Sequence, residues 1–195
     1  MEGGFRTINM RNLIEEVRKF VEEESKKPTA KYGYEPYEFH LIPVRNYAVE
    51  LAKKLNADVE IVEIAAWLHD IGSIINGRNN HHLTGAEIAE NKLKELDYPL
   101  EKIERVKSCI LNHRGSVNSH RTTLEEQIIS DADTISNFDN ISGLFKAAFV
   151  YENLNQREGG ISVREKLQRK WNQLCLEESK NLIKSKYEAV MLLLT

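Results

Sequence analysis

The feature that most constrains the fold is the spacing of apolar residues, which follows the period of an α-helix along almost the whole chain. The clearest example lies in residues 44–55, where apolar side chains recur at steps of three and four residues. No segment shows the alternation of apolar and polar residues that is typical of a half-buried strand. The pattern therefore predicts an all-α protein.

The same periodicity predicts the order of the helices. Helices are expected over residues 10–27, 44–55, 59–70, 84–96, 103–111 and 124–135, with two or three more in 141–194. The stretch "GSIINGRNN" is expected to be a loop, and Gly159 and Gly160 are expected to interrupt the C-terminal helices. We expect one structural domain in three parts: an N-terminal helix and connector in 1–34, a core in 35–140, and C-terminal helices in 141–195 that pack on the core.

Composition excludes several classes of protein. With 195 residues, 41% hydrophobic and 29% charged, the chain can form a packed core. A net charge of −3 gives no basic surface for a nucleic-acid polymer or an anionic membrane. Cys109 and Cys175 are too few for a disulfide framework or a thiolate zinc site. Without an apolar stretch long enough to span a membrane, the simplest expectation is a cytoplasmic protein, either a monomer or a homo-oligomer.

The motif "AAWLHDIGS", residues 65–73, places His69 and Asp70 directly after a run of residues that belong in a core. Burial of such groups is costly unless they find partners. Either the helix reaches the surface at this point, or the two side chains share a metal ion that makes their burial tolerable.

Three other polar residues occupy positions where the helical pattern expects apolar ones. His40 extends the apolar stripe that follows it by one turn, His113 continues the apolar series of its own helix, and Asp131 falls on the inward face of its helix. Each could be a core residue with a separate hydrogen-bond partner, or a cap for a neighbouring helix. One divalent cation would satisfy several of these groups at once, and this favours a shared metal site.

The donor set consists of imidazoles and carboxylates without thiolates. Such a set suits Mn, Fe, Co, Ni, Zn or Mg rather than copper(I) or a structural zinc. Coordination positions that the protein leaves open would take water and substrate, so the composition of the site indicates catalysis.

The order of these residues resembles the H…HD…D pattern of the HD superfamily of metal-dependent phosphohydrolases. The resemblance extends to the segments "HLIPVRNYAVELA", "AAWLHDIG" and "IISDADTIS" and covers roughly residues 35–140. It implies a helical HD-type domain that hydrolyses phosphate esters. It also implies a first metal site on four residues: His40, His69, Asp70 and Asp131.

The segments "HHLTGAEIAENKL" and "ILNHRG" resemble those that hold a second metal in many members of this family. The resemblance selects His81 over His82, because His81 stands four residues before Gly85, and adds His113. Whether the chain holds one ion or two stays open. In the catalytic roles that the resemblance implies, Asp70 orients a water molecule, and His113 could donate a proton if no second ion binds.

The expected substrate is a small phosphorylated molecule, favoured to be a nucleotide cleaved at a phosphate monoester or a phosphoanhydride. Arg45, Arg114 and Arg121 are the cations nearest in sequence to the predicted site, so they are candidates for phosphate binding. On an ideal helix, Arg45 points about 140° away from His40, which also allows a surface position.

The sequence leaves three alternatives open. The protein could be a sensor that binds a metal and a nucleotide without catalysis. It could hydrolyse dinucleoside polyphosphates through a two-metal site. A minor alternative is a diiron oxygenase, since a few HD proteins use oxygen.

Overall fold

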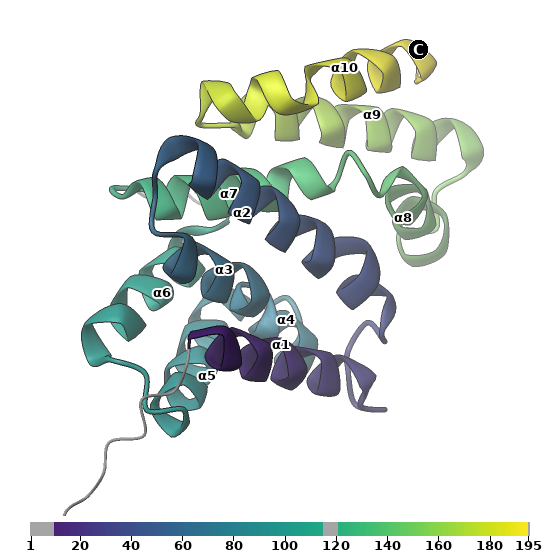
Figure 1. The fold of residues 1–195 in the computed structure, drawn as a ribbon. Coiled ribbons are helices and arrows are strands. Elements are labelled where there is room, and N and C mark those ends of the chain that lie inside the picture. The colour runs from purple at the N-terminus through teal and green to yellow at the C-terminus, as the bar shows by residue number, and fades with distance from the viewer. Residues whose placement is uncertain (1–9, 115–120, 195) are drawn as a thin grey trace, which may run out of the picture.

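The structure is a computed structural model that describes residues 10–114 and 121–194, and within those ranges every regular element is a helix (Figure 1). The elements in chain order are α1 (Met10–Lys26), η1 (Tyr37–Leu41), α2 (Ile42–Leu55), α3 (Val59–Leu68), α4 (Ile71–Asn76), α5 (His81–Glu95), α6 (Leu100–Asn112), α7 (Leu124–Ser136), α8 (Ile141–Lys146), η2 (Ala147–Tyr151), α9 (Gln156–Gln173) and α10 (Glu177–Leu193). The elements η1 and η2 are single π-helical turns. The all-α prediction is confirmed.

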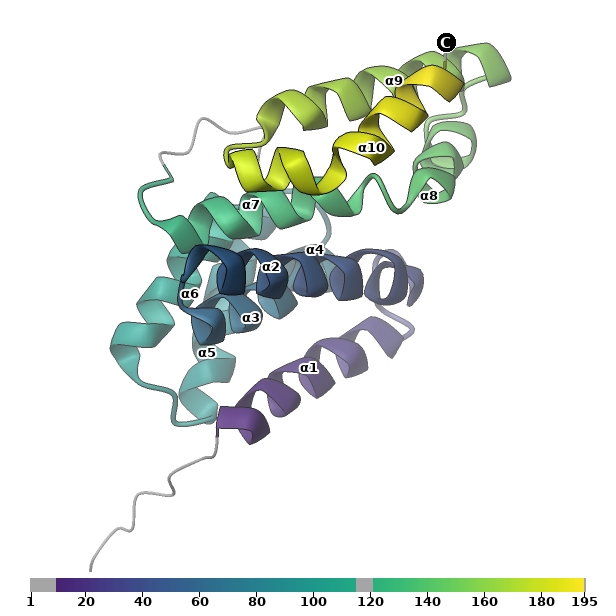
Figure 2. The same ribbon diagram turned by 45° about the horizontal axis from the view of Figure 1, so that its top comes forward.

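The helices form layers, with α2 and α7 in the middle (Figure 1). The pair α9 and α10 covers one side of α7, and α2 and α3 lie against its other side. Beyond them, α1, α5 and α6 close the opposite side of the molecule, as Figure 2 shows from a second direction. Helix α7 is therefore buried on two faces, and this arrangement decides which partner each of its polar side chains meets.

Helix α3 is the centre of the core because it carries apolar side chains on nearly every side. All of its residues from Ile64 to Leu68 are buried. The carboxylate of Asp58 accepts a hydrogen bond from the amide of Ile61 at the N-terminus of the helix, as expected for an N-cap. The helix ends at Leu68, so His69 and Asp70 follow directly at its C-terminal end, where His69 is buried and Asp70 is half-buried.

Two predicted boundaries were wrong near the HD pair. The segment expected to be a loop begins with the short helix α4, and α5 begins at His81 rather than at residue 84. Asn80, in the left-handed backbone conformation, turns the chain into α5. This earlier start places His81 on the first turn of a helix.

The prediction that Gly159 and Gly160 interrupt the C-terminal helices was also wrong. Both lie near the start of α9, which begins with a capping box formed by Asn155 and Glu158. The cap satisfies amides of the first turn, so that the helix forms despite two glycines.

Helices α4 and α5 cross at unusually close range. A Cβ atom on Gly72 would lie 2.3 Å from the carbonyl oxygen of His81 and 2.6 Å from the amide nitrogen of Gly85. Only a residue without a side chain allows this approach. The contact brings the start of α5 next to the HD pair.

Among the described residues, no helix is both long and apolar enough to cross a membrane.

Candidate metal centre

Three histidines stand at ends of helices, and each is anchored by a backbone carbonyl. The Nδ1 atoms of His69, His81 and His113 lie 2.8, 2.9 and 2.6 Å from the carbonyl oxygens of residues 66, 78 and 110. A carbonyl only accepts hydrogen bonds, so each Nδ1 carries the proton. Each Nε2 therefore presents its lone pair, as metal-binding histidines do.

His40 is oriented by a serine instead. Its Nδ1 lies 2.9 Å from the hydroxyl oxygen of Ser136, and that hydroxyl donates its own proton to the carbonyl of Asp133 at 2.8 Å. Because the serine proton is already engaged, the serine oxygen accepts from Nδ1 of His40. In neutral His40 the Nε2 atom is left with a lone pair, like those of the other three histidines. Without a cation, the carboxylates of Asp70 and Asp133 raise the pKa of His40.

The four imidazoles face one another in two pairs. The Nε2 atoms of His40 and His69 are 3.2 Å apart, and those of His81 and His113 are also 3.2 Å apart. Two lone pairs at this distance repel each other unless a proton or a cation lies nearby. Two nitrogens that each lie about 2.1 Å from one ion, at right angles, are separated by about 3 Å. The donor arrangement therefore fits a metal ion.

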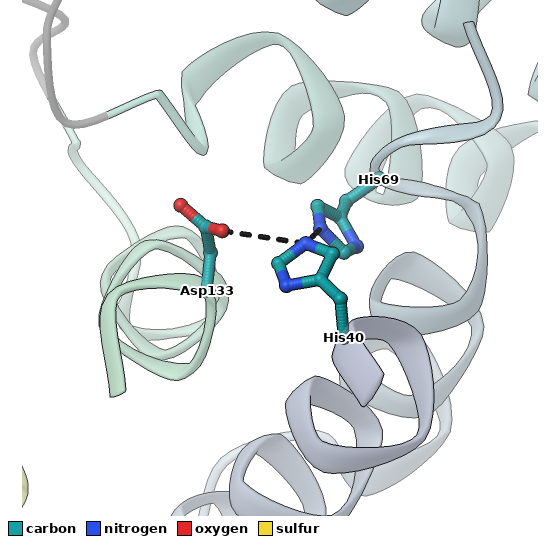
Figure 3. A group of neighbouring side chains, drawn as sticks. All are labelled: His40, His69 and Asp133. Atoms are coloured by element: carbon teal, nitrogen blue, oxygen red, sulfur yellow. Dashed lines mark hydrogen bonds and ion pairs between the residues drawn. The ribbon is translucent and has the colours of Figure 1, made fainter. Parts of the chain in front are cut away.

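Two carboxylates complete the cluster. The Oδ2 atom of Asp70 lies 3.3 Å from Nε2 of His40, and its Oδ1 atom lies 3.2 Å from Nε2 of His81. Asp133 approaches the same nitrogen of His40 at 3.5 Å, and Figure 3 shows the side chains of His40, His69 and Asp133 converging from separate segments of the chain. The six side chains form two groups, His40–His69–Asp133 and Asp70–His81–His113, and Asp70 faces both.

The charges in the cluster match what a cation requires. Burial alone would raise the pKa values of Asp70 and Asp133, but the neighbouring imidazoles, together with Lys170 at Asp133, hold both pKa values below their ordinary range. Burial lowers the pKa of His69 and lowers that of His113 to about 4. Near neutral pH, these carboxylates are ionised and these two imidazoles are neutral, which are the forms that bind metals.

The prediction that Asp131 closes this site needs correction. Its two oxygens accept hydrogen bonds from the backbone amides of Cys175 and Leu176, both at 2.9 Å, just before α10. Residues two apart on a helix leave it about 200° apart, so Asp131 faces the C-terminal helices while Asp133 faces the histidines. The sequence does contain a signal for Asp133, since "DAD" places two aspartates on opposite sides of the same helix.

Replacing Asp131 with alanine is expected to lower stability without emptying a metal site. Two backbone amides would lose their acceptor, at a cost of about 1–3 kcal/mol. Urea denaturation followed by circular dichroism measures the loss, and elemental analysis measures the metal. Loss of metal from a folded Asp131→Ala protein would contradict the assignment.

A pocket of about 780 Å³ opens beside the cluster, and His40, Asp70 and Asp133 are among its lining residues. Of the three predicted arginines, only Arg114 lines it. Arg121 donates instead to the carbonyls of residues 112 and 114, at 3.0 and 2.9 Å. It supports the backbone next to His113, and the geometry gives no support to a direct role in substrate binding.

The geometry also gives no support to substrate binding by Arg45. Its guanidinium pairs with Glu63, with Nε 2.8 Å from the carboxylate, and it does not line the pocket. Replacing Arg45 with alanine is expected to change kcat/KM less than about two-fold and stability by less than about 1 kcal/mol. Steady-state kinetics and urea denaturation test both expectations. A ten-fold rise in KM would contradict this prediction and indicate that Arg45 binds the substrate.

Comparison of the sequence with known protein families gives a match. The model of the HD domain matches residues 37–137. A tRNA (cytidine(56)-2'-O)-methyltransferase from Thermoplasma volcanium is 32% identical over 120 residues. That match covers 54% of this chain and 33% of the methyltransferase, so the chain spans about a third of that protein's length.

Two solved structures share the fold over nearly their whole length. An HD-superfamily hydrolase from Bacillus thuringiensis has a TM-score of 0.72 at 18% identity, covering 95% of this chain and 94% of its own. Bacillus subtilis YpgQ, solved in complex with ADP, has a TM-score of 0.69 at 23% identity and covers 92% of each chain. At these identities, the likeness is evidence for the fold alone. The family match spans more than half of the sequence, and the chain belongs to the HD-domain family.

Proposed function

We propose that this protein is a metal-dependent phosphohydrolase that cleaves a phosphate monoester or phosphoanhydride of a nucleotide. The observation that carries the proposal is the pairwise convergence of four Nε2 lone pairs around Asp70. The family, whose solved members include proteins described as hydrolases, supports the same class of chemistry. Support for a nucleotide comes from the ADP bound to YpgQ, a protein of the same fold.

We assign the first metal site to His40, His69, Asp70 and Asp133, and a second to His81 and His113 with Asp70 shared. The shared role rests on the two oxygens of Asp70, which face different histidine pairs. A divalent cation bound here would lower the pKa of a water molecule and polarise a phosphoryl oxygen.

The protein's own groups would position the reaction. Asp70 can accept a hydrogen bond from the attacking water and hold it in line with the phosphorus. Water adds to phosphorus and gives up one proton as the bond to the leaving oxygen breaks, and the leaving oxygen takes up one proton from solvent. With its Nδ1 proton engaged and its pKa lowered to about 4 by burial, His113 has no proton at Nε2 near neutral pH. The geometry thus favours His113 as a ligand over His113 as an acid.

Metal removal tests the proposal. We expect that chelation with EDTA, followed by dialysis, abolishes hydrolysis of p-nitrophenyl phosphate or its bis-ester, and that one of Mn, Co, Ni, Fe, Zn or Mg restores it. Nucleoside mono-, di- and triphosphates and dinucleoside polyphosphates are then screened with the active metal. Unchanged turnover in metal-free protein would contradict the proposal. A metal-loaded protein without turnover on any of these substrates would instead support the sensor alternative.

A further inference from the structure

Helix α9 contributes a second set of polar residues to the pocket. Lys166 and Lys170, one turn apart, both line it, and so does Arg78 from the connection between α4 and α5. Both lysines lie outside the residues that match the HD-domain family. They belong to a part of the chain that the family model does not cover, so residues there can determine which substrate this protein prefers.

These cations differ in how their charges are balanced. Lys170 lies 3.3 Å from the carboxylate of Asp133 and so helps to hold it. Among the residues that the structure describes, neither Lys166 nor Arg78 forms an ion pair with a carboxylate. Burial, with the positive charges of Arg78 and Lys170, lowers the pKa of Lys166. Lys166 is half-buried and Arg78 is exposed, and the carboxylates of Glu152 and Asp133 only partly oppose the lowering of the Lys166 pKa. A half-buried ammonium group beside two other cations is unfavourable unless an anion binds there.

Two other cations of the same pocket already have carboxylate partners. Lys146 pairs with Glu35 at 2.6 Å, and Arg169 approaches Glu165 at 3.9 Å. Arg114 lies 3.5 Å from a ring nitrogen of His82. Among the described residues, the pocket cations that form no ion pair with a carboxylate are therefore Arg114, Lys166 and Arg78. Lys166 lies close enough to Arg78 and Lys170 to feel their charges, and Lys170 contacts Asp133.

We infer that Lys166 and Arg78 form an anion subsite for the phosphates that adjoin the one being hydrolysed. The inference rests on the proposed function and selects, within it, substrates with a chain of phosphates, such as nucleoside di- and triphosphates. A monoester carries one phosphate, which the metal cluster would engage, and it would leave Lys166 and Arg78 without an anion. Lysine and arginine supply the charge-assisted hydrogen bonds that a phosphate chain accepts.

The test measures binding of inorganic triphosphate, as its magnesium complex, to the metal-loaded protein by calorimetry, with orthophosphate and citrate as comparison anions. The variants are Lys166→Met, Arg78→Met and the double variant. Arg164→Met is the matched control, because Arg164 is an exposed residue of the same helix that does not line the pocket. Circular dichroism and metal content confirm that each variant is folded and loaded. Lys166→Gln replaces Lys166→Met if the latter does not fold.

We expect each single variant to raise the Kd for triphosphate at least about ten-fold, the loss of one hydrogen bond between charged groups. The double variant is expected to raise it further, while Arg164→Met leaves it unchanged and the Kd for orthophosphate changes less than that for triphosphate. Equal Kd values in all variants would overturn the inference, and so would tight citrate binding with the same dependence on Lys166. The experiment measures binding rather than turnover. Triphosphate binding that depends on Lys166 and Arg78, in a protein that hydrolyses none of the substrates, would therefore refute only the proposed function.

Discussion

Replacing Asp70 with asparagine is expected to lower kcat for phosphate-ester hydrolysis by at least about 10²-fold, the loss that follows removal of one preorganised charged or polar group from such a site. The substitution keeps the shape of the side chain but removes the charge that faces both histidine pairs. An uncharged amide also binds a divalent cation less tightly, so metal content per chain is expected to fall. Kinetics at saturating metal and elemental analysis after dialysis measure the two effects.

The matched control for Asp70→Asn is Asp131→Asn, a buried aspartate that faces the backbone before α10. It makes the same chemical change outside the cluster, on the opposite side of α7 from Asp133. We expect it to keep its metal and its kcat within about two-fold, since no group of the cluster loses a partner. An Asp70→Asn protein that retained both wild-type activity and metal would contradict the assigned role of Asp70.

Replacing Gly72 with alanine is expected to lower the free energy of unfolding by about 3 kcal/mol, at the upper end for overpacking. The new methyl group would meet backbone atoms of His81 and Gly85, at 2.3 and 2.6 Å, and backbone atoms cannot rotate out of its way. Helices α4 and α5 would have to separate, which moves His81 away from His113. Urea denaturation measures the loss of stability, and elemental analysis measures the accompanying loss of metal.

Gly160→Ala is the matched control for Gly72→Ala. A Cβ atom at Gly160 would meet nothing within 4 Å, and the residue lies in the helical part of α9. Alanine there is expected to raise stability by about 0.4–1 kcal/mol, because it restricts the unfolded chain. If Gly72→Ala were as stable as Gly160→Ala, the close crossing of α4 and α5 would not be a constraint on the site.

Much of this fold could be predicted from the sequence, because helical spacing is a local property. His40, His69, Asp70, His81 and His113 all lie in the two groups of the candidate site, and their roles as metal ligands stay a prediction. Periodicity shows that a polar residue points inward, and an inward polar residue needs a partner. It does not show which neighbouring helix supplies that partner.

Asp131 illustrates this limit. Helix α7 is covered by α2 and α3 on one side and by α9 and α10 on the other. Asp131 is fully buried, as the pattern indicated, but it is buried against the C-terminal helices. A helix covered on two sides gives each aspartate of "DAD" a neighbouring layer to face. Only the tertiary arrangement shows that Asp133 faces the histidines and Asp131 faces the amides before α10.

The cations could not be predicted for a related reason. Proximity in sequence points to Arg45, Arg114 and Arg121, of which only Arg114 lines the pocket, whereas Lys166 and Lys170 reach it from α9, far along the chain. Arg45 meets Glu63 on the adjacent helix α3 instead. Contacts between distant segments depend on how helices pack, and no local pattern in a single sequence reports that packing.

The most direct test of the central claim is a crystal structure of the manganese-loaded protein with anomalous diffraction data. The account predicts anomalous peaks among the six side chains, one within reach of His40, His69, Asp70 and Asp133 and another beside His81 and His113. A manganese-loaded crystal with no peak among these residues would contradict it.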